Sequence, residues 1–119
     1  MDWIYIDDVI SGLLAATQVR NVPERTIDIG SGSLTSVRDI VAHLSRLTGS
    51  VATPVFGALP DRPFEPVRVA NVAEAQSALA WRPAVSMIEG LRLTVDAYRQ
   101  TLEPCRTAHS AGLGHFEEP

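Results

Sequence analysis

The chain has 119 residues, of which 45% are hydrophobic and 20% are charged, and its formal net charge is −4. This length accommodates one domain with a single modest core. All ten basic residues are arginines scattered along an acidic chain, so the sequence lacks the basic patch that nucleic-acid binding requires.

Strands and helices are predicted to alternate in the amino-terminal part. Residues 3–6, Trp-Ile-Tyr-Ile, are typical of a short buried strand. Asp7 or Asp8 can cap the helix that follows, since a carboxylate accepts hydrogen bonds from first-turn amides. That helix should end near residues 18–20, and a second strand is predicted at residues 26–29. One side of the helix carries Val9, Ile10, Leu13, Leu14 and Thr17.

A turn with Gly30 and Gly32 follows the second predicted strand. The dinucleotide-binding fingerprint requires a third glycine where Thr35 stands, and an acidic residue about 20 positions later that the sequence does not provide. A Walker A loop is excluded because the chain has no lysine. The two glycines therefore predict a turn after a strand, with no phosphate loop.

The next helix begins with a capping box at Ser36, in which Asp39 replaces the usual glutamate. Gly49 stands where a helix carboxyl-terminal glycine is expected. Its apolar stripe contains Val37, Ile40, Val41, Leu44 and Leu47.

Strands are predicted at residues 53–56 and 67–70, on either side of a proline-rich loop. Asn71 can cap a short helix from Val72 to about Leu79. A complete capping box, Ser86 to Glu89, opens a last helix that should end near Leu102, before Pro104. The predicted fold class is α/β, or α+β-like, with short strands and three to four helices. It forms one domain over residues 1–102, followed by a disordered tail, 103–119.

The candidates for chemistry are few. The three histidines, His43, His109 and His115, have no metal-ligand spacing, so no metal site is predicted. No Gly-x-Ser-x-Gly motif exposes a nucleophile. Arg62 lies in the stiff segment Leu-Pro-Asp-Arg-Pro-Phe-Glu-Pro, where it either binds a phosphate in bidentate fashion or pairs with Asp61 or Glu65 at the surface.

Cys105 is the only cysteine, which excludes an intrachain disulfide and fits a reducing compartment. The first 16 residues carry aspartates where a signal peptide is uncharged. No apolar run approaches the ~18 residues of a membrane-spanning helix. A cytoplasmic location and no membrane partner are expected.

Four segments in order resemble the carboxy-terminal, substrate-binding half of the extended short-chain dehydrogenase/reductases, the NAD-dependent epimerases and dehydratases of nucleotide sugars. The segments are DWIYIDDVISGLLAA (2–16), TIDIGSGSLTSVRDIVAHLSRLTG (26–49), PDRPFEPVRVANVAEAQSALAWRP (60–83) and VSMIEGLRLTVDAY (85–98). The resemblance implies that the glycine turn belongs to the substrate half, so Gly30 and Gly32 do not bind the cofactor.

The resemblance also implies four substrate-binding residues. Trp3 matches an aromatic position near the substrate, and Val37 matches a residue that lines the nucleotide base. Arg62 matches the arginine that binds the substrate pyrophosphate. Glu65 matches the acidic residue, usually aspartate, that meets the ribose.

The chain departs from the family pattern in its catalytic and cofactor-binding parts. Without lysine it cannot contain the family's catalytic Tyr-x-x-x-Lys pair. The family's glycine-rich cofactor loop is missing. Met1 stands where the family usually has a second arginine that binds the substrate pyrophosphate. No catalytic residue and no cofactor are therefore expected for this chain alone, although NAD(P) is implied for a complete family member.

Two functions of different classes follow. The first is the nucleotide-sugar-binding part of an epimerase or dehydratase, inactive alone, with a UDP- or dTDP-sugar as ligand. The second is a non-catalytic dimerisation or docking module; a soluble domain without a ligand is a third possibility. A homodimer, or docking to a Rossmann-containing chain, is expected to cover the residue 3–6 strand and the apolar helix stripes at residues 9–17 and 87–102.

Overall fold

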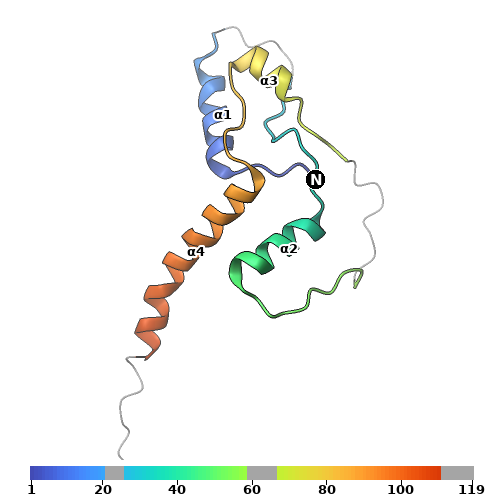
Figure 1. Ribbon diagram of the computed structural model, residues 1–119. Helices are drawn as coiled ribbons and strands as arrows, with labels where there is room; N and C mark the ends of the chain where they lie inside the picture. The colour runs from blue at the N-terminus through green and yellow to red at the C-terminus, as the bar shows by residue number, and fades with distance from the viewer. Residues whose placement is uncertain (21–25, 59–66, 111–119) are drawn as a thin grey trace, which may run out of the picture.

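The computed structural model describes residues 1–20, 26–58 and 67–110, without the side chains of residues 103–110. This part of the chain contains four helices, namely α1 (Ile6–Gln18), α2 (Val37–Thr48), α3 (Val72–Leu79) and α4 (Met87–Ser110) (Figure 1). Helix α1 lies beside α3, and α2 lies beside α4. The carboxyl-terminal part of α4 extends away from the other helices (Figure 1).

The expected α/β fold is not observed, because residues 1–20, 26–58 and 67–110 include no strand. Three of the four predicted strands, at residues 3–6, 26–29 and 67–70, form no strand: Ile6 belongs to α1, and the other residues lie outside any helix or strand. The described residues contain one isolated antiparallel bridge, between Asp2 and Leu34. The fourth, at residues 53–56, is exposed throughout. A β-propensity becomes a strand only when another segment supplies the ladder of hydrogen bonds.

The apolar core lies where α3 and the segment after it meet α1. Ala75, Leu79 and Trp81 form a buried cluster, and Ile4 and Ile29 pack against it from the extended segments. The Trp81 indole nitrogen donates a 2.8 Å hydrogen bond to the Ser11 hydroxyl on α1, which satisfies the only polar atom of this buried ring.

Helix α1 corrects two predictions. Its N-cap is Tyr5, which makes no side-chain capping bond, so the predicted cap at Asp7 or Asp8 is wrong. Ile6, which was predicted to end a strand, is the first residue of the helix. Asp8 is 4% exposed and accepts hydrogen bonds from the backbone amides of Ala84 and Val85, at 3.0 and 2.9 Å. The carboxylate therefore ties α1 to the segment that leads into α4.

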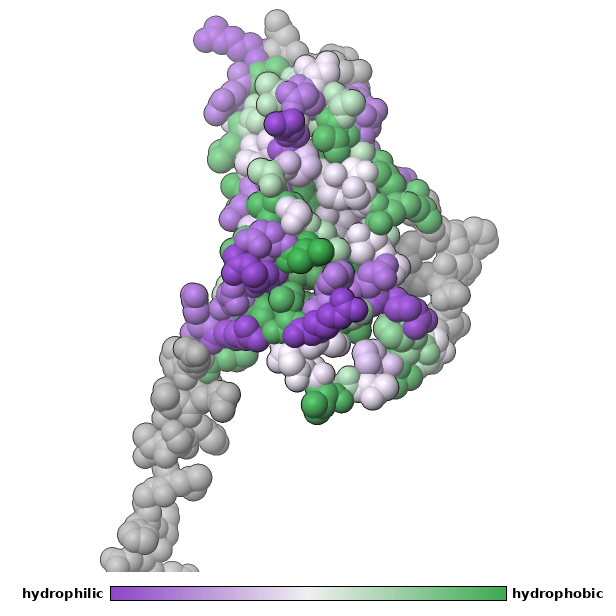
Figure 2. Space-filling view, viewed as in Figure 1, coloured by the Kyte–Doolittle hydropathy of each residue, from purple (hydrophilic) through white to green (hydrophobic). Residues whose placement is uncertain are grey.

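The apolar stripe of α1 lies on the exposed side of the helix. Gly12 and Asp8 are the buried residues, whereas Ile10, Leu13 and Leu14 are each about half exposed. Figure 2 shows apolar side chains at the surface along α1 and elsewhere on this face, among polar ones. Most of this stripe is therefore not covered by other parts of the described chain.

The other helix starts agree with the sequence. Ser36 caps α2 by accepting from the Asp39 amide at 3.1 Å, Asn71 caps α3 by accepting from the Glu74 amide at 3.2 Å, and the Ser86 hydroxyl accepts from the Glu89 amide at 3.3 Å. As expected, α2 ends at Gly49, whose φ of 66° is left-handed.

Helix α4 extends beyond its predicted end near residue 102 and continues through Pro104 to Ser110. An interior proline costs one helical hydrogen bond and a local clash, which a long helix can tolerate with a bend. The domain boundary at residue 102 stays a prediction, because residues 111–119 lie outside the described part of the chain.

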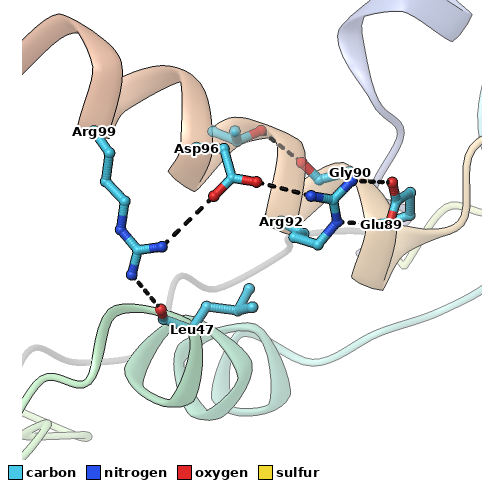
Figure 3. A network of polar contacts seen from close by, with 7 residues as sticks. Leu47, Glu89, Gly90, Arg92, Asp96 and Arg99 are labelled. Atoms are coloured by element: carbon cyan, nitrogen blue, oxygen red, sulfur yellow. Dashed lines mark hydrogen bonds and ion pairs between the residues drawn. The ribbon is translucent and has the colours of Figure 1, made fainter.

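A network of charged side chains along α4 reaches α2 through Arg99 (Figure 3). Arg92 forms ion pairs with Glu89 at 2.6 Å and with Asp96 at 2.8 Å along α4. Arg99 pairs with Asp96 and donates a 2.7 Å hydrogen bond to the Leu47 carbonyl near the end of α2. This contact also satisfies one of the carbonyls that a helix end leaves without a partner.

None of the helices, over the residues that the structure describes, is both long and apolar enough to cross a membrane.

Candidate functional site

Three segments of the chain, at residues 1–5, 26–32 and 67–70, meet at the carboxylate of Asp2. Its Oδ1 accepts from the Ser31 amide at 2.8 Å and from the Ser31 hydroxyl at 2.5 Å. Its Oδ2 accepts from the amides of Gly32 and Ala70, both at 3.0 Å. One side chain thus connects parts of the chain that are up to 68 residues apart.

These contacts control the ionisation of Asp2. Partial burial acts to raise the pKa of the carboxyl group, but the hydrogen bonds from the Ser31 hydroxyl and from the amides of Ala70, Ser31 and Gly32 together lower the pKa below its ordinary value of 3.8. Asp2 is therefore an anion at neutral pH. Its hydrogen bonds from the hydroxyl and amide donors are stronger than those of a neutral carboxyl group would be.

The glycines of the turn make this convergence possible. A Cβ on Gly30 would lie 2.5 Å from the Ala70 Cβ and 2.7 Å from the Asp2 carboxylate. Gly32 has a φ of 75°, which places its amide toward Asp2 in a conformation that other residues rarely adopt. The sequence interpretation of a turn without a phosphate is consistent with this geometry, since the turn amides of residues 31 and 32 are already bound to Asp2.

Two of the four predicted substrate residues lie on either side of this turn. The Trp3 indole nitrogen donates a 3.1 Å hydrogen bond to the Thr35 carbonyl. The amino group of Met1 donates to the same carbonyl, and the Thr35 amide donates to the Met1 carbonyl. Val37 follows two residues later as the first residue of α2, with 51% of its surface exposed. Trp3 and Val37 are thus held near each other by one short stretch of backbone.

Arg62 and Glu65, the other two predicted substrate residues, lie outside the described residues. The flanking positions at residues 58 and 67 are described, and residues 67–70 belong to the convergence at Asp2.

An open hollow of about 450 Å³ lies beside Asp2 between the same three segments. Its polar lining residues are Asp2, Asp28 and Arg68. The remaining lining is mostly aliphatic and comes from Met1, Ile4, Ile29, Gly30, Val67, Val69 and Ala70. Neither Trp3 nor Val37 lines the hollow, so it is distinct from the surface that those residues form.

Asp2 is the residue that sequence reasoning missed, since it was considered only as a charge near the amino terminus. A usable signal was present: consecutive amides in a Gly/Ser turn form a concave anion-binding site, which a nearby carboxylate can occupy. For metals, the described residues contain no group of three or more His, Cys, Asp or Glu side chains placed to hold an ion.

Comparison with curated proteins finds UDP-sugar epimerases. The chain is 29% identical over 103 residues to a UDP-glucuronate 4-epimerase of Thermodesulfobacterium geofontis, matching 86% of this chain and 31% of that protein. It is 26% identical over 106 residues to a UDP-glucose 4-epimerase of Mycolicibacterium smegmatis, matching 82% and 31%. The chain therefore spans about a third of the length of these relatives. No family model matches it.

Solved structures give the same result. The Bacillus cereus UDP-glucuronic acid 4-epimerase in complex with UDP-glucuronic acid and NAD is 33% identical with a TM-score of 0.72, over 84% of this chain and 32% of that one. MoeE5 in complex with UDP-glucuronic acid and NAD is 29% identical with a TM-score of 0.72, over 85% and 33%. The described fold is thus also found within larger proteins.

Proposed function

Since the chain corresponds to part of the NAD-dependent epimerase/dehydratase family of nucleotide sugars, we propose that it is the nucleotide-sugar-binding part of such an enzyme. The observation that carries the proposal is the match of 84% of the chain to one third of an epimerase solved with a UDP-sugar. A UDP-hexose or UDP-uronic acid is the proposed ligand class.

The geometry supports a role for Trp3 and Val37 in this ligand surface. The indole of Trp3 is anchored to the Thr35 carbonyl, and Val37 presents an exposed apolar side chain at the start of α2. A flat apolar base can pack against such a surface, and the positively charged Arg62 would hold the pyrophosphate while Glu65 meets the ribose. These four assignments are proposals.

The chain alone would not catalyse epimerisation. It contains no lysine and so no Tyr-x-x-x-Lys pair, and it has no family cofactor loop. NAD is the cofactor named with the similar structures, and in our proposal a complete enzyme would receive NAD on residues that this chain does not supply.

Titration calorimetry of the 119-residue chain with UDP-glucuronic acid and with UDP-glucose tests the proposal. We expect saturable binding, weakened at least about tenfold in Arg62→Ala, because charge-assisted phosphate contacts are worth about 1.5–3 kcal/mol. Arg46→Ala, an exposed arginine in the last turn of α2, is the matched control. Equal affinity of wild type and Arg62→Ala would remove Arg62 from the site, and no binding of either sugar nucleotide would refute the function.

A non-catalytic docking module is the second candidate. The exposed apolar stripe of α1 favours it, since Ile6, Ile10, Leu13 and Leu14 are each about half exposed. One chain can both dock to a partner and bind a nucleotide sugar. Titration calorimetry measures the sugar binding, and light scattering measures the association with a partner.

A further inference from the structure

The guanidinium of Arg38 lies over the ring of Phe56, with its central carbon 4.1 Å from the ring centroid. This distance is typical of a cation–π contact and is short enough for the flat guanidinium to lie on the ring. Arg38 belongs to the first turn of α2, whereas Phe56 belongs to the segment at residues 51–58, which is exposed throughout. The ring therefore supports one side of a guanidinium at the surface.

The other side of this guanidinium is available to a ligand. Arg92 and Arg99 on α4 are engaged in ion pairs, and Arg99 also donates to a carbonyl. Arg38 makes no hydrogen bond or ion pair with another residue in the ranges 1–20, 26–58 and 67–110, and its side chain is exposed. One planar face and the N–H groups of Arg38 are thus free to contact a ligand.

The neighbours of Arg38 favour a flat, neutral group over a phosphate. Val37 precedes it with 51% of its surface exposed, and Phe56 is 40% exposed, so apolar surface adjoins the guanidinium. Asp39 follows it and accepts a 2.6 Å hydrogen bond from the Ser36 hydroxyl, which holds the pKa of Asp39 below its ordinary value of 3.8. This carboxylate is an anion at neutral pH and repels a phosphate, whereas it does not repel an uncharged ring.

We propose that the base of the nucleotide sugar stacks on the open face of Arg38, beside Val37, so that Phe56, Arg38 and the base form three layers. This inference rests on the proposed function and adds Arg38 and Phe56 to its ligand surface. Bases stack on arginine guanidinium planes as well as on aromatic rings. Because every base has a π face, such a contact adds affinity without choosing between bases.

Phe56 prepares Arg38 for this contact. A free arginine side chain has many rotamers, and holding it in one of them costs entropy when a ligand binds. The ring already holds the guanidinium in the unliganded chain, so less of that entropy remains to be lost. Arg38 is thus the residue that contacts the base, and Phe56 is the residue that positions Arg38.

Variants of Arg38 separate stacking from charge when the intact 119-residue chain is titrated with UDP-glucose by calorimetry. Arg38→Ala should weaken binding at least about fivefold, the range of a lost stacking contact. Arg38→Lys keeps the charge but loses the planar group, so it should weaken binding to a similar extent. Arg38→Gln keeps a planar amide without the charge and should lose less. Arg46→Ala, an exposed arginine in the last turn of the same helix, is the matched control and should bind like wild type.

Variants of Phe56 test the positioning role. Phe56→Leu keeps an apolar side chain but removes the ring, so it should weaken binding about twofold or more. Phe56→Trp supplies the best ring for a cation–π contact and should restore the affinity of wild type. Val55→Ala, at the neighbouring position with 80% exposure, is the control. Thermal melts identify any variant that fails to fold.

Nuclear magnetic resonance of the wild-type complex tests the contact without any substitution. We expect nuclear Overhauser effects from the uracil H5 and H6 protons of UDP-glucose to the side chain of Arg38 and to the methyl groups of Val37. A purely structural role of Arg38 would give none of these signals.

Three results would overturn this inference while wild type still binds UDP-glucose and the proposed function stands. They are equal affinity of wild type and Arg38→Ala, full affinity of Arg38→Lys, and no uracil signal to Arg38 in a saturated complex. Failure of wild type to bind UDP-glucose would refute both the proposed function and the stacking role of Arg38.

Discussion

The two helix pairs of this protein are held together in different ways. Helices α1 and α3 meet over a buried cluster of Ala75, Leu79 and Trp81. Helices α2 and α4 are joined at their surface by Arg99, whose side chain is 55% exposed and donates a hydrogen bond to the Leu47 carbonyl on α2. Burial of apolar surface stabilises a contact far more than exposed charge pairs do. The first pair is therefore expected to dominate the stability, and the second to adjust the orientation of α4.

Truncation of the core is the most severe test of this difference. Trp81→Ala removes a 6% exposed indole and the 2.8 Å hydrogen bond to Ser11. It should reduce the free energy of unfolding by about 3–5 kcal/mol. Urea denaturation followed by circular dichroism measures the loss, and a change below about 1 kcal/mol would contradict the assignment of the core.

The buried carboxylate of Asp8 is the second test. Asp8→Asn keeps the size of the side chain but places an NH₂ group against one of the amides of Ala84 and Val85, so it should cost about 1–3 kcal/mol. Asp7→Asn, at the exposed neighbouring position, is the matched control. Similar urea midpoints for the two variants would show that the link from α1 to α4 does not depend on Asp8.

The third test measures how the hydrogen bonds of the Asp2 carboxylate change stability with pH. Because the folded-state pKa lies below its ordinary value of 3.8, the carboxylate contributes stability that is fully present above pH ~4 and is lost as the pH falls through the folded pKa. Asp2→Asn should be less stable than wild type at pH 6, and the difference should shrink below pH ~4. Chemical denaturation at several pH values measures it. A difference that is independent of pH would assign the effect of Asp2 to packing alone.

The smallest effect is expected at the surface link between α2 and α4. Arg99→Ala removes the 2.7 Å hydrogen bond to the Leu47 carbonyl and one ion pair, and should change the free energy of unfolding by at most about 0.5 kcal/mol. The remaining effect should decrease in 1 M salt. A loss as large as that of Trp81→Ala would show that the two helix pairs are held with similar strength.

Local chemistry made the starts of α2, α3 and α4 and the end of α2 predictable from the sequence. Ser36, Asn71 and Ser86 each supply a side-chain oxygen to a first-turn amide, and Gly49 accepts a left-handed conformation at a helix end. These interactions span three or four residues, so short sequence patterns contain the necessary information. The start of α1 was predicted less well, since Tyr5 is an N-cap without a side-chain bond.

Contacts between distant residues decided the rest. A strand requires a partner, and the segments at residues 3–5, 26–29 and 67–70 have the composition of strands but no ladder in the described part of the chain. Periodicity identified the apolar stripe of α1 but could not say whether another element covers it. Asp8 was assigned to a cap because capping is local, whereas its partners are 76 and 77 residues away.

The sequence by itself determined where α2, α3 and α4 start and that the chain resembles part of a larger enzyme family. Both depend on residue types at short spacings within single segments. Only the tertiary structure decided that Asp2 joins three segments, that Trp3 bonds to the backbone beside Val37, and that an aliphatic hollow lies open between extended segments. Those features arise when segments up to 68 residues apart meet, and each depends on a partner that no local pattern specifies.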